Sequence, residues 1–168
     1  YYDAGKAEIY QFSDNDQQWV QVGDSILPDP GHCRFGWPVS LSANGTRVAV
    51  SGSGYLGNVS YCYNDTNALY AADTGDVRVW ELREGNWTQI SHAFVGTNDT
   101  DGLGWSISLS GDGSTIAMGA SNSDRVDVNQ GYARAYRLQC GEWMQVGTDI
   151  EGTEADDWTG HAVSLSYN

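Results

Sequence analysis

Carboxylates are the side chains whose clustering comes nearest to a chemical site in this sequence. Two groups occupy equivalent connecting segments, so they could share one face of the molecule. A glycosidase needs two carboxylates on opposite walls of a cleft, and a calcium ion takes about 6–8 oxygen ligands. We interpret both groups as solvated loops, with weak calcium binding as the first alternative and acid–base catalysis as the last. The larger group is Glu151, Glu154, Asp156 and Asp157, and the smaller is Asp99 and Asp101.

The histidines and the catalytic motifs argue against an enzyme. His32, His92 and His161 lie in or beside connections between predicted strands, and none stands at ligand spacing from a cysteine or carboxylate. The sequence has no Gly-x-Ser-x-Gly elbow, phosphate-binding loop or His-Glu-x-x-His motif. We therefore predict surface or packing histidines, no catalytic residue, no metal ligand and no cofactor. On these grounds we expect that the chain is not an enzyme.

The charge balance restricts the partners. The chain has 168 residues, with 8 basic and 22 acidic side chains and a formal net charge of -14. A phosphate backbone and an anionic lipid surface would both repel it, so we expect no nucleic acid partner. No stretch approaches the ~18 apolar residues of a membrane span, so we expect no membrane insertion. Solubility is the simplest role for the acidity, and cation binding by acidic loops is the alternative.

Three patterns recur in the same order along the chain. Each unit has a glycine with an alternating strand, then a strand that opens on tryptophan, then a serine-rich strand. Trp19 and Trp87 are 68 residues apart, whereas Trp87 and Trp143 are 56 apart. The unit is therefore 56 residues long, and the first interval carries a 12-residue insertion within 51–74. The patterns cover residues 5–10, 75–80 and 131–136; 19–23, 87–90 and 143–147; and 36–42, 104–110 and 160–166.

A fourth strand follows each complete serine-rich strand through a two-residue turn. The turns are Asn44-Gly45 and Asp112-Gly113, and each leads into an alternating run. Such pairs between alternating runs are the strongest short signal for a β-hairpin. We therefore predict an all-β fold of tandem four-stranded antiparallel meanders, with about 11 strands. The single β-repeat domain 1–168 would comprise a half unit at 5–23, full units at 36–91 and 104–147, and a first strand only at 160–168.

The two faces of the serine-rich strand differ in size. Val39 and Leu41 point one way, and Ser40 and Ser42 point the other. A row of small residues opposite large ones lets sheets stack closely face to face. The pattern favours propeller blades or a stacked β array.

In this order the motifs resemble the FG-GAP-like repeats of integrin-type β-propellers, which are common in large secreted and surface proteins of microbes and algae. The resemblance covers nearly the whole chain and implies blade-like units. Calcium-binding members of that family carry an Asp-rich loop between the first two strands of a blade. Here those loops, 42–46 and 110–114, hold at most one carboxylate each, so the metal site is not carried over.

Sequons for N-linked glycosylation are more frequent than the composition alone predicts. All five fall in predicted turns or loops, which indicates a secretory pathway and an extracellular, sugar-coated surface. The sequence begins at Tyr1 without a signal segment, so we expect a mature or trimmed product. The sequon residues are Asn44, Asn58, Asn64, Asn86 and Asn98.

The cysteines are consistent with an oxidising compartment. In a meander, the loop before the first strand and the loop between the second and third strands lie at the same end. Cys33 and Cys62 occupy these two loops, so we predict a disulfide between them. Cys140 lies in a hairpin at the opposite end and should be free or intermolecular.

Both ends of the chain hold incomplete units. Residues 162–166 form a first strand without a second, whereas 7–10 and 19–22 form a third and fourth strand without a beginning. Natural proteins rarely leave such edges open. We predict head-to-tail contact between these ends, made with other copies or with further repeats of a longer chain. The assembly edge is Ala162, Val163, Ser164, Leu165 and Ser166 together with Ala7, Glu8, Ile9 and Tyr10.

The function predicted from these patterns is an extracellular structural glycoprotein that assembles into a fibre or array. The alternative is a ligand-binding β-propeller of a larger surface protein, serving adhesion or recognition of carbohydrate or protein. The insertion bears on this choice, because its tyrosines would either cover a contact between units or stack on sugar. They are Tyr55, Tyr61, Tyr63 and Tyr70.

Overall fold

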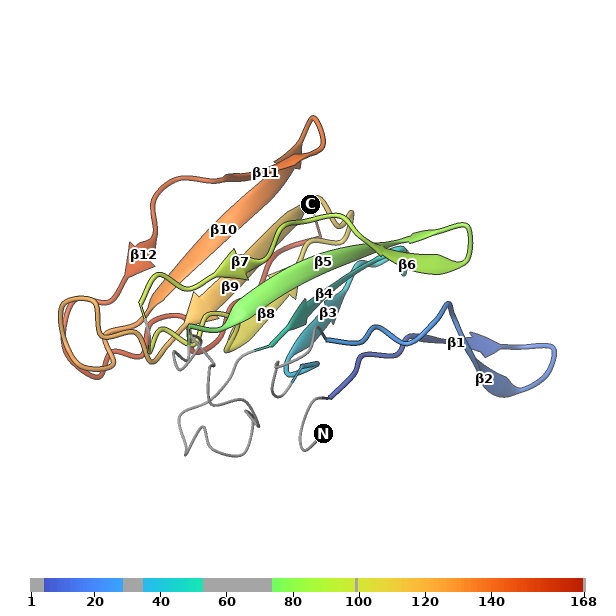
Figure 1. The fold of residues 1–168 in the computed structure, drawn as a ribbon, viewed down its shortest axis with the longest axis horizontal. Helices are drawn as coiled ribbons and strands as arrows, with labels where there is room; N and C mark the ends of the chain where they lie inside the picture. The colour runs from blue at the N-terminus through green and yellow to red at the C-terminus, as the bar shows by residue number, and fades with distance from the viewer. Residues whose placement is uncertain (1–4, 29–34, 53–73, 99, 168) are drawn as a thin grey trace, which may run out of the picture.

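The structure is a computed structural model, and it describes residues 5–28, 35–52, 74–98 and 100–167. These residues form an all-β fold with 12 strands in three antiparallel sheets (Figure 1). Within them, no helix is long and apolar enough to span a membrane. The strands are β1 Tyr10–Ser13, β2 Gln18–Gln21, β3 Val39–Leu41, β4 Arg47–Ser51, β5 Asp76–Arg83, β6 Asn86–Gln89, β7 Phe94–Val95, β8 Ser106–Leu109, β9 Thr115–Ala120, β10 Tyr132–Gln139, β11 Glu142–Gln145 and β12 Ile150–Glu151.

The two larger sheets confirm the predicted four-stranded meander. The first runs in the order β3-β4-β5-β6, and the second runs in the order β8-β9-β10-β11. Their registers match between the repeats, because Val48 lies opposite Trp80 in the first sheet and Ile116 lies opposite Tyr136 in the second. Four-stranded antiparallel units that stack face to face are the arrangement of propeller blades.

The hairpin turns also repeat. Asn44 Oδ1 accepts hydrogen bonds from Ser42 Oγ and from the Thr46 amide, at 2.8 and 3.1 Å. Asp112 Oδ1 accepts the corresponding bonds from Ser110 and Ser114. The side chain at the head of each turn therefore fixes the same local geometry in both units.

Each larger sheet gains a short strand that the sequence did not predict. β7 pairs with β5 and β12 pairs with β10, so each connecting segment returns along the third strand of its own unit. The third strands are eight residues long and the fourth strands only four, which leaves room on the same edge for the extra pairing.

The two ends of the chain differ from the prediction. The N-terminal strand is β1, displaced from the expected 7–10, and only isolated bridges at Gly5 and Ala7 precede it. Residues 162–166 do not form a strand. The described residues supply no second strand beside this segment, so its amides have no sheet ladder to join.

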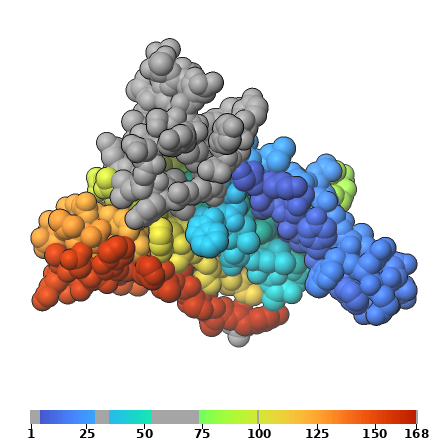
Figure 2. Space-filling model, turned by 90° about the horizontal axis from the view of Figure 1, so that it is seen from below, coloured from blue at the N-terminus to red at the C-terminus, as the bar shows by residue number. Residues whose placement is uncertain are grey.

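Two hydrophobic clusters hold the three sheets together. One lies between the two larger sheets and includes Ala49, Val79, Ile116 and Met118. The other lies between β1–β2 with its flanking segments and the first sheet, and it includes Ile26, Val48 and Trp80. Neighbouring residues of β4 therefore contribute to different clusters, which is the two-sided burial that stacked blades require. Figure 2 shows the N-terminal part, in blue, at one side of the molecule and the part of the chain near residue 125, in orange, at the other.

Candidate functional site

The repeating contact between units is the first feature of the site. Leu109 on β8 donates its amide hydrogen to Ser40 Oγ on β3, at 2.9 Å. One unit later, Leu165 donates its amide hydrogen to Ser108 Oγ at the same distance. Each serine hydroxyl thus accepts the amide hydrogen of the equivalent leucine one unit later.

A main-chain bond repeats beside these serine contacts. The Ala43 amide donates to the carbonyl oxygen of Gly111 at 2.9 Å, and the Gly111 amide donates to the carbonyl oxygen of Tyr167 at 3.1 Å. These residues occupy the same place in successive units, because they are separated by the repeat spacings of 68 and 56. The predicted edge segment 162–166 therefore lies against the second sheet of its own chain as the start of a third unit.

Equivalent residues of successive units differ in exposure on the side of the unit that faces the preceding one. Leu109 is 6% exposed where the first sheet covers it, whereas its repeat equivalent Leu41 is 47% exposed. Trp87 donates its indole N–H to the carbonyl oxygen of Val22, at 2.8 Å, across the contact between units. Trp19 holds the same place one unit earlier and is 68% exposed. We call this side, with Trp19, Val39 and Leu41, the leading face.

The opposite side shows the same change. Ile26 is 4% exposed, and its equivalent Phe94 packs against Tyr136 and Trp143 of the following unit. The third equivalent, Ile150, is 69% exposed. Met144 on β11 is exposed as well, and we call this side, with Ile150 and Met144, the trailing face. Where two units of the chain meet, the facing residues are covered. Their equivalents on the leading and trailing faces are exposed.

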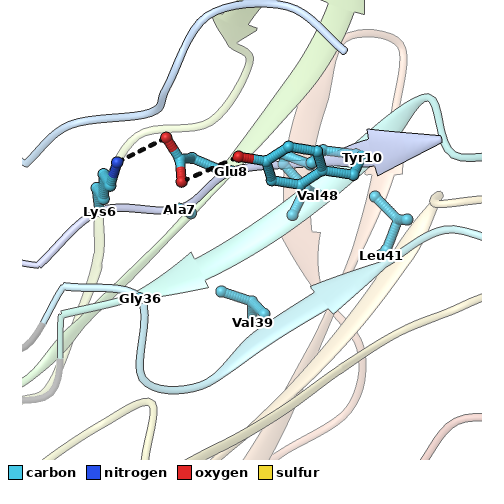
Figure 3. A pocket seen from close by; sticks show the side chains of 9 residues that line it. Lys6, Ala7, Glu8, Tyr10, Gly36, Val39, Leu41 and Val48 are labelled. Carbon is cyan, nitrogen blue, oxygen red and sulfur yellow. Dashed lines mark hydrogen bonds and ion pairs between the residues drawn. The ribbon is translucent and has the colours of Figure 1, made fainter. Parts of the chain in front are cut away.

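A slot lies on the leading side, between the N-terminal segment and the first sheet (Figure 3). It has a volume of about 350 Å³ and is lined by residues 6–10 on one wall and by Val39, Leu41 and Val48 on the other. Along the first wall Lys6 and Glu8 form an ion pair at 2.7 Å, and Tyr10 donates its hydroxyl hydrogen to Glu8. Hydrogen bonds from Lys6 and then Ser25 lower the pKa of Glu8. The predicted edge residues Ala7, Glu8, Ile9 and Tyr10 thus come together at this slot, away from 162–166.

The acidic connecting segments do not behave as one class. The sequence predicted solvated loops, but Asp101 is fully buried, and its carboxylate accepts hydrogen bonds from Ser123 Oγ and Tyr132 OH at 2.6 and 3.0 Å. Burial raises the pKa of Asp101, but these bonds and those from the amides of Thr97 and Asn98 outweigh it and lower the pKa. Asp157 closes the equivalent loop and remains exposed. No group of three or more metal-ligating side chains forms in the part of the chain that the structure describes.

Sequence reasoning missed a charged network around Tyr132. The guanidinium groups of Arg125 and Arg134 lie 3.7 and 4.6 Å from the centre of the Tyr132 ring. Both also pair with Asp149, at 2.7 and 2.6 Å. Burial opposes the charge on Asp149, but the hydrogen bonds from Arg134 and Arg125 lower its pKa. Because these charges satisfy one another, the network ties the connecting segments to β10, and no spacing pattern in the sequence marks it.

Comparisons with known proteins give a likeness in fold alone. No protein-family model matches the sequence, so membership of the FG-GAP-like family is not confirmed, and no curated protein matches it. Among solved structures, the fold is similar to that of a periplasmic gluconolactonase of Pseudomonas aeruginosa, with a TM-score of 0.47 and 15% identity. The similarity covers 94% of this chain and 39% of that one. The neighbour is an enzyme, which contradicts our expectation that this chain is not an enzyme, and we withdraw that expectation.

The histidines and cysteines are placed only in part. His92 and His161 are exposed, and the His161 ring lies 5.8 Å from that of Trp105. Cys140 is an exposed free cysteine in the turn between β10 and β11. His32, Cys33 and Cys62 lie outside the described residues, so the predicted disulfide stays a prediction. The insertion tyrosines lie outside them as well.

Three of the five sequon asparagines lie on the described surface. Asn44 is exposed in the turn between β3 and β4, Asn86 opens β6, and Asn98 lies in the connection after β7. Asn44 uses its Oδ1 within the turn, where it accepts a hydrogen bond from Thr46 Oγ1 at 2.8 Å. Asn58 and Asn64 lie outside the described residues.

We expect at least three of the five sequon asparagines to carry N-linked glycans when the protein is made in a secretory host. The reason is their place in exposed turns and connections, which a transferase can reach. The intact mass should fall on treatment with an amidase that removes N-glycans. Thr46→Ala should remove one glycan and serve as an internal control. An unchanged mass after treatment would contradict the prediction.

Proposed function

We propose that this chain is a module of an exported structural glycoprotein in which four-stranded units add face to face, head to tail, into a fibre or array. The observation that carries the proposal is the repeat-wise change in burial. Leu109 and Ile26 are covered by neighbouring units, whereas their equivalents Leu41 and Ile150 are open at the two sides. Equivalent residues have equivalent chemistry, so each open face is suited to another unit of the same kind.

The two open faces are complementary and different, which supports a head-to-tail contact. The trailing face would meet the leading face of the next unit as the first sheet meets the second within this chain. Such a contact makes a ring if the rotation closes and a filament if it does not. The covering units would be copies of this chain or further repeats of a longer one.

Export and glycosylation are the second part of the proposal. The exposed sequons on Asn44, Asn86 and Asn98 support it, because only proteins that enter a secretory pathway are modified there. Asn44 lies in the turn between β3 and β4, and Asn86 lies at the start of β6.

The test of assembly is the concentration dependence of molecular mass. The 168-residue chain should form oligomers whose mass grows with concentration, seen by sedimentation and by electron imaging as linear particles. Ile150→Asp should weaken association about tenfold or more, because it replaces an exposed apolar side chain of the trailing face with a charge. Val126→Asp is the matched control, since Val126 is exposed in the connection between β9 and β10 and is not one of the residues that define either face. A monomer at all concentrations, or equal effects of the two variants, would overturn the proposal.

A further inference from the structure

The slot of Figure 3 is bordered by a strand edge with which no strand of the described residues pairs. Ala7 exchanges main-chain hydrogen bonds with Ile26, and the carbonyl oxygen of Ile9 accepts one from Val22 at 2.9 Å. In an antiparallel ladder, successive residues direct their main-chain groups to opposite sides. The N–H and C=O groups of Glu8 and Tyr10 therefore point the other way, into the slot that these residues line.

Both full units have a strand at this place. Tyr136 is the repeat equivalent of Tyr10, and it lies opposite Ile116 of β9. Trp80 is the other equivalent, and it lies opposite Val48 of β4. In each full unit the strand that pairs with this edge, β4 or β9, is the second strand of a hairpin. The first strand of that hairpin packs against the following unit. The slot is therefore the place of a second strand in a unit that here has only its third and fourth.

The far wall of the slot fits the first arm of the same hairpin. Within the chain, β3 covers Leu109 and its Ser40 hydroxyl accepts the Leu109 amide. Leu41 is the equivalent of Leu109, it is half exposed, and its amide makes no hydrogen bond to any side chain of the described residues. A first strand that carries a serine would meet both features of Leu41. Its hydroxyl would accept the Leu41 amide hydrogen, and the strand would cover the exposed Leu41 side chain.

We propose that the slot binds a β-hairpin made of the first two strands of another unit. This inference deepens the proposed function by naming the partner of the leading face, and it fixes a register. With residues 104–121 as the partner hairpin, Ile116 would lie opposite Tyr10 and Ala117 opposite Ile9, as they lie opposite Tyr136 and Ala135 in this chain. Ser108 Oγ would accept the Leu41 amide. Ala117, equivalent to the fully buried Ala49, would face the slot.

A synthetic peptide of residues 104–121 tests this with the full chain. Hydrogen–deuterium exchange should slow at the amides of Glu8, Tyr10 and Leu41 when the peptide is added. The same peptide with Ala117→Asp should bind at least tenfold more weakly, because its carboxylate would be placed against Leu41 and Val48. On the chain, Leu41→Asp should weaken binding to a similar extent, and Val126→Asp should leave it unchanged.

A fusion gives a second measurement that does not depend on the solubility of the peptide. Residues 104–121 joined ahead of the chain by a flexible linker of about 15 residues should raise the melting temperature by several degrees. Leu41→Asp should abolish that rise. No rise and no protection, or equal binding of the Ala117→Asp peptide, would overturn the inference. If the chain assembles but Glu8 and Tyr10 stay unprotected, the slot inference alone fails. If the hairpin binds while the chain remains monomeric, the assembly proposal alone fails.

Discussion

Replacing Asp101 with alanine should lower the free energy of unfolding by about 3–5 kcal/mol. The carboxylate is fully buried and accepts hydrogen bonds from the Thr97 and Asn98 amides, at 2.8 and 3.1 Å, and from Ser123 Oγ and Tyr132 OH. Alanine would leave the buried hydroxyl groups of Ser123 and Tyr132 without this acceptor, and each unsatisfied buried donor carries a desolvation cost. Urea unfolding followed by tryptophan fluorescence measures the loss.

Asp157→Ala is the matched control for this prediction. Asp157 accepts the equivalent two loop amides, from Thr153 and Glu154 at 2.7 and 3.0 Å. Its side chain is exposed, and within the described ranges no strand residue bonds to it. Water can replace its hydrogen bonds, so the loss should be much smaller. Equal losses in the two variants would show that the burial of Asp101 by Ser123 and Tyr132 contributes nothing to the free energy of unfolding.

The stabilisation that Asp101 contributes should depend on pH in one direction. Its pKa in the folded protein lies below the ordinary value of 3.8, because the hydrogen bonds to the charged form outweigh the opposing effect of burial. The stabilisation is therefore present above about pH 4 and is lost as the pH falls through the lowered pKa. The difference in unfolding free energy between wild type and Asp101→Asn should shrink below about pH 4. A difference that stays constant down to the acid limit would contradict the assignment.

The repeat spacing predicts most of the fold because the turns and the alternation of side chains depend on residues that are close in the sequence. Asn44-Gly45 and Asp112-Gly113 set the turns, and the alternation beside them sets which side chains face which neighbour. The short strands β7 and β12 could not be read, because two residues carry no periodicity and their pairing depends on the length of the third strand. The segment 162–166 has the correct strand pattern, but a pattern without a pairing partner does not make a strand.

The site was less predictable because it depends on contacts between units. The serines at 40 and 108 are visible as a repeat, yet their role as acceptors for a neighbouring edge follows only from the stacking. Asp101 and Asp157 share a loop pattern, with a threonine four residues before each carboxylate. Only the first is buried, because Ser123 and Tyr132 from other segments close over it. The sequence of the loop holds no signal of that difference.

Gly75→Ala should lower the free energy of unfolding by about 3 kcal/mol or more. Gly75 has φ of 66°, and a Cβ at this position would overlap the carbonyl oxygen of Leu103 and lie 2.5 Å from its amide nitrogen. Both atoms belong to the main chain, so no side chain can rotate away to relieve the clash. Urea unfolding again measures the loss, and the slope of the transition shows whether the variant starts from the same compact state.

Gly45→Ala separates the clash from the backbone conformation. Gly45 has φ of 70°, and nothing lies within 4 Å of the position that its Cβ would take. It should cost only the left-handed conformation, about 1 kcal/mol. The extra loss in Gly75→Ala therefore measures how closely the start of each third strand approaches the segment that leads into the next unit. Gly5 against Phe35 and Gly131 against Thr159 repeat this approach. Similar losses for the two alanine variants would mean that the close approach does not couple one unit to the next.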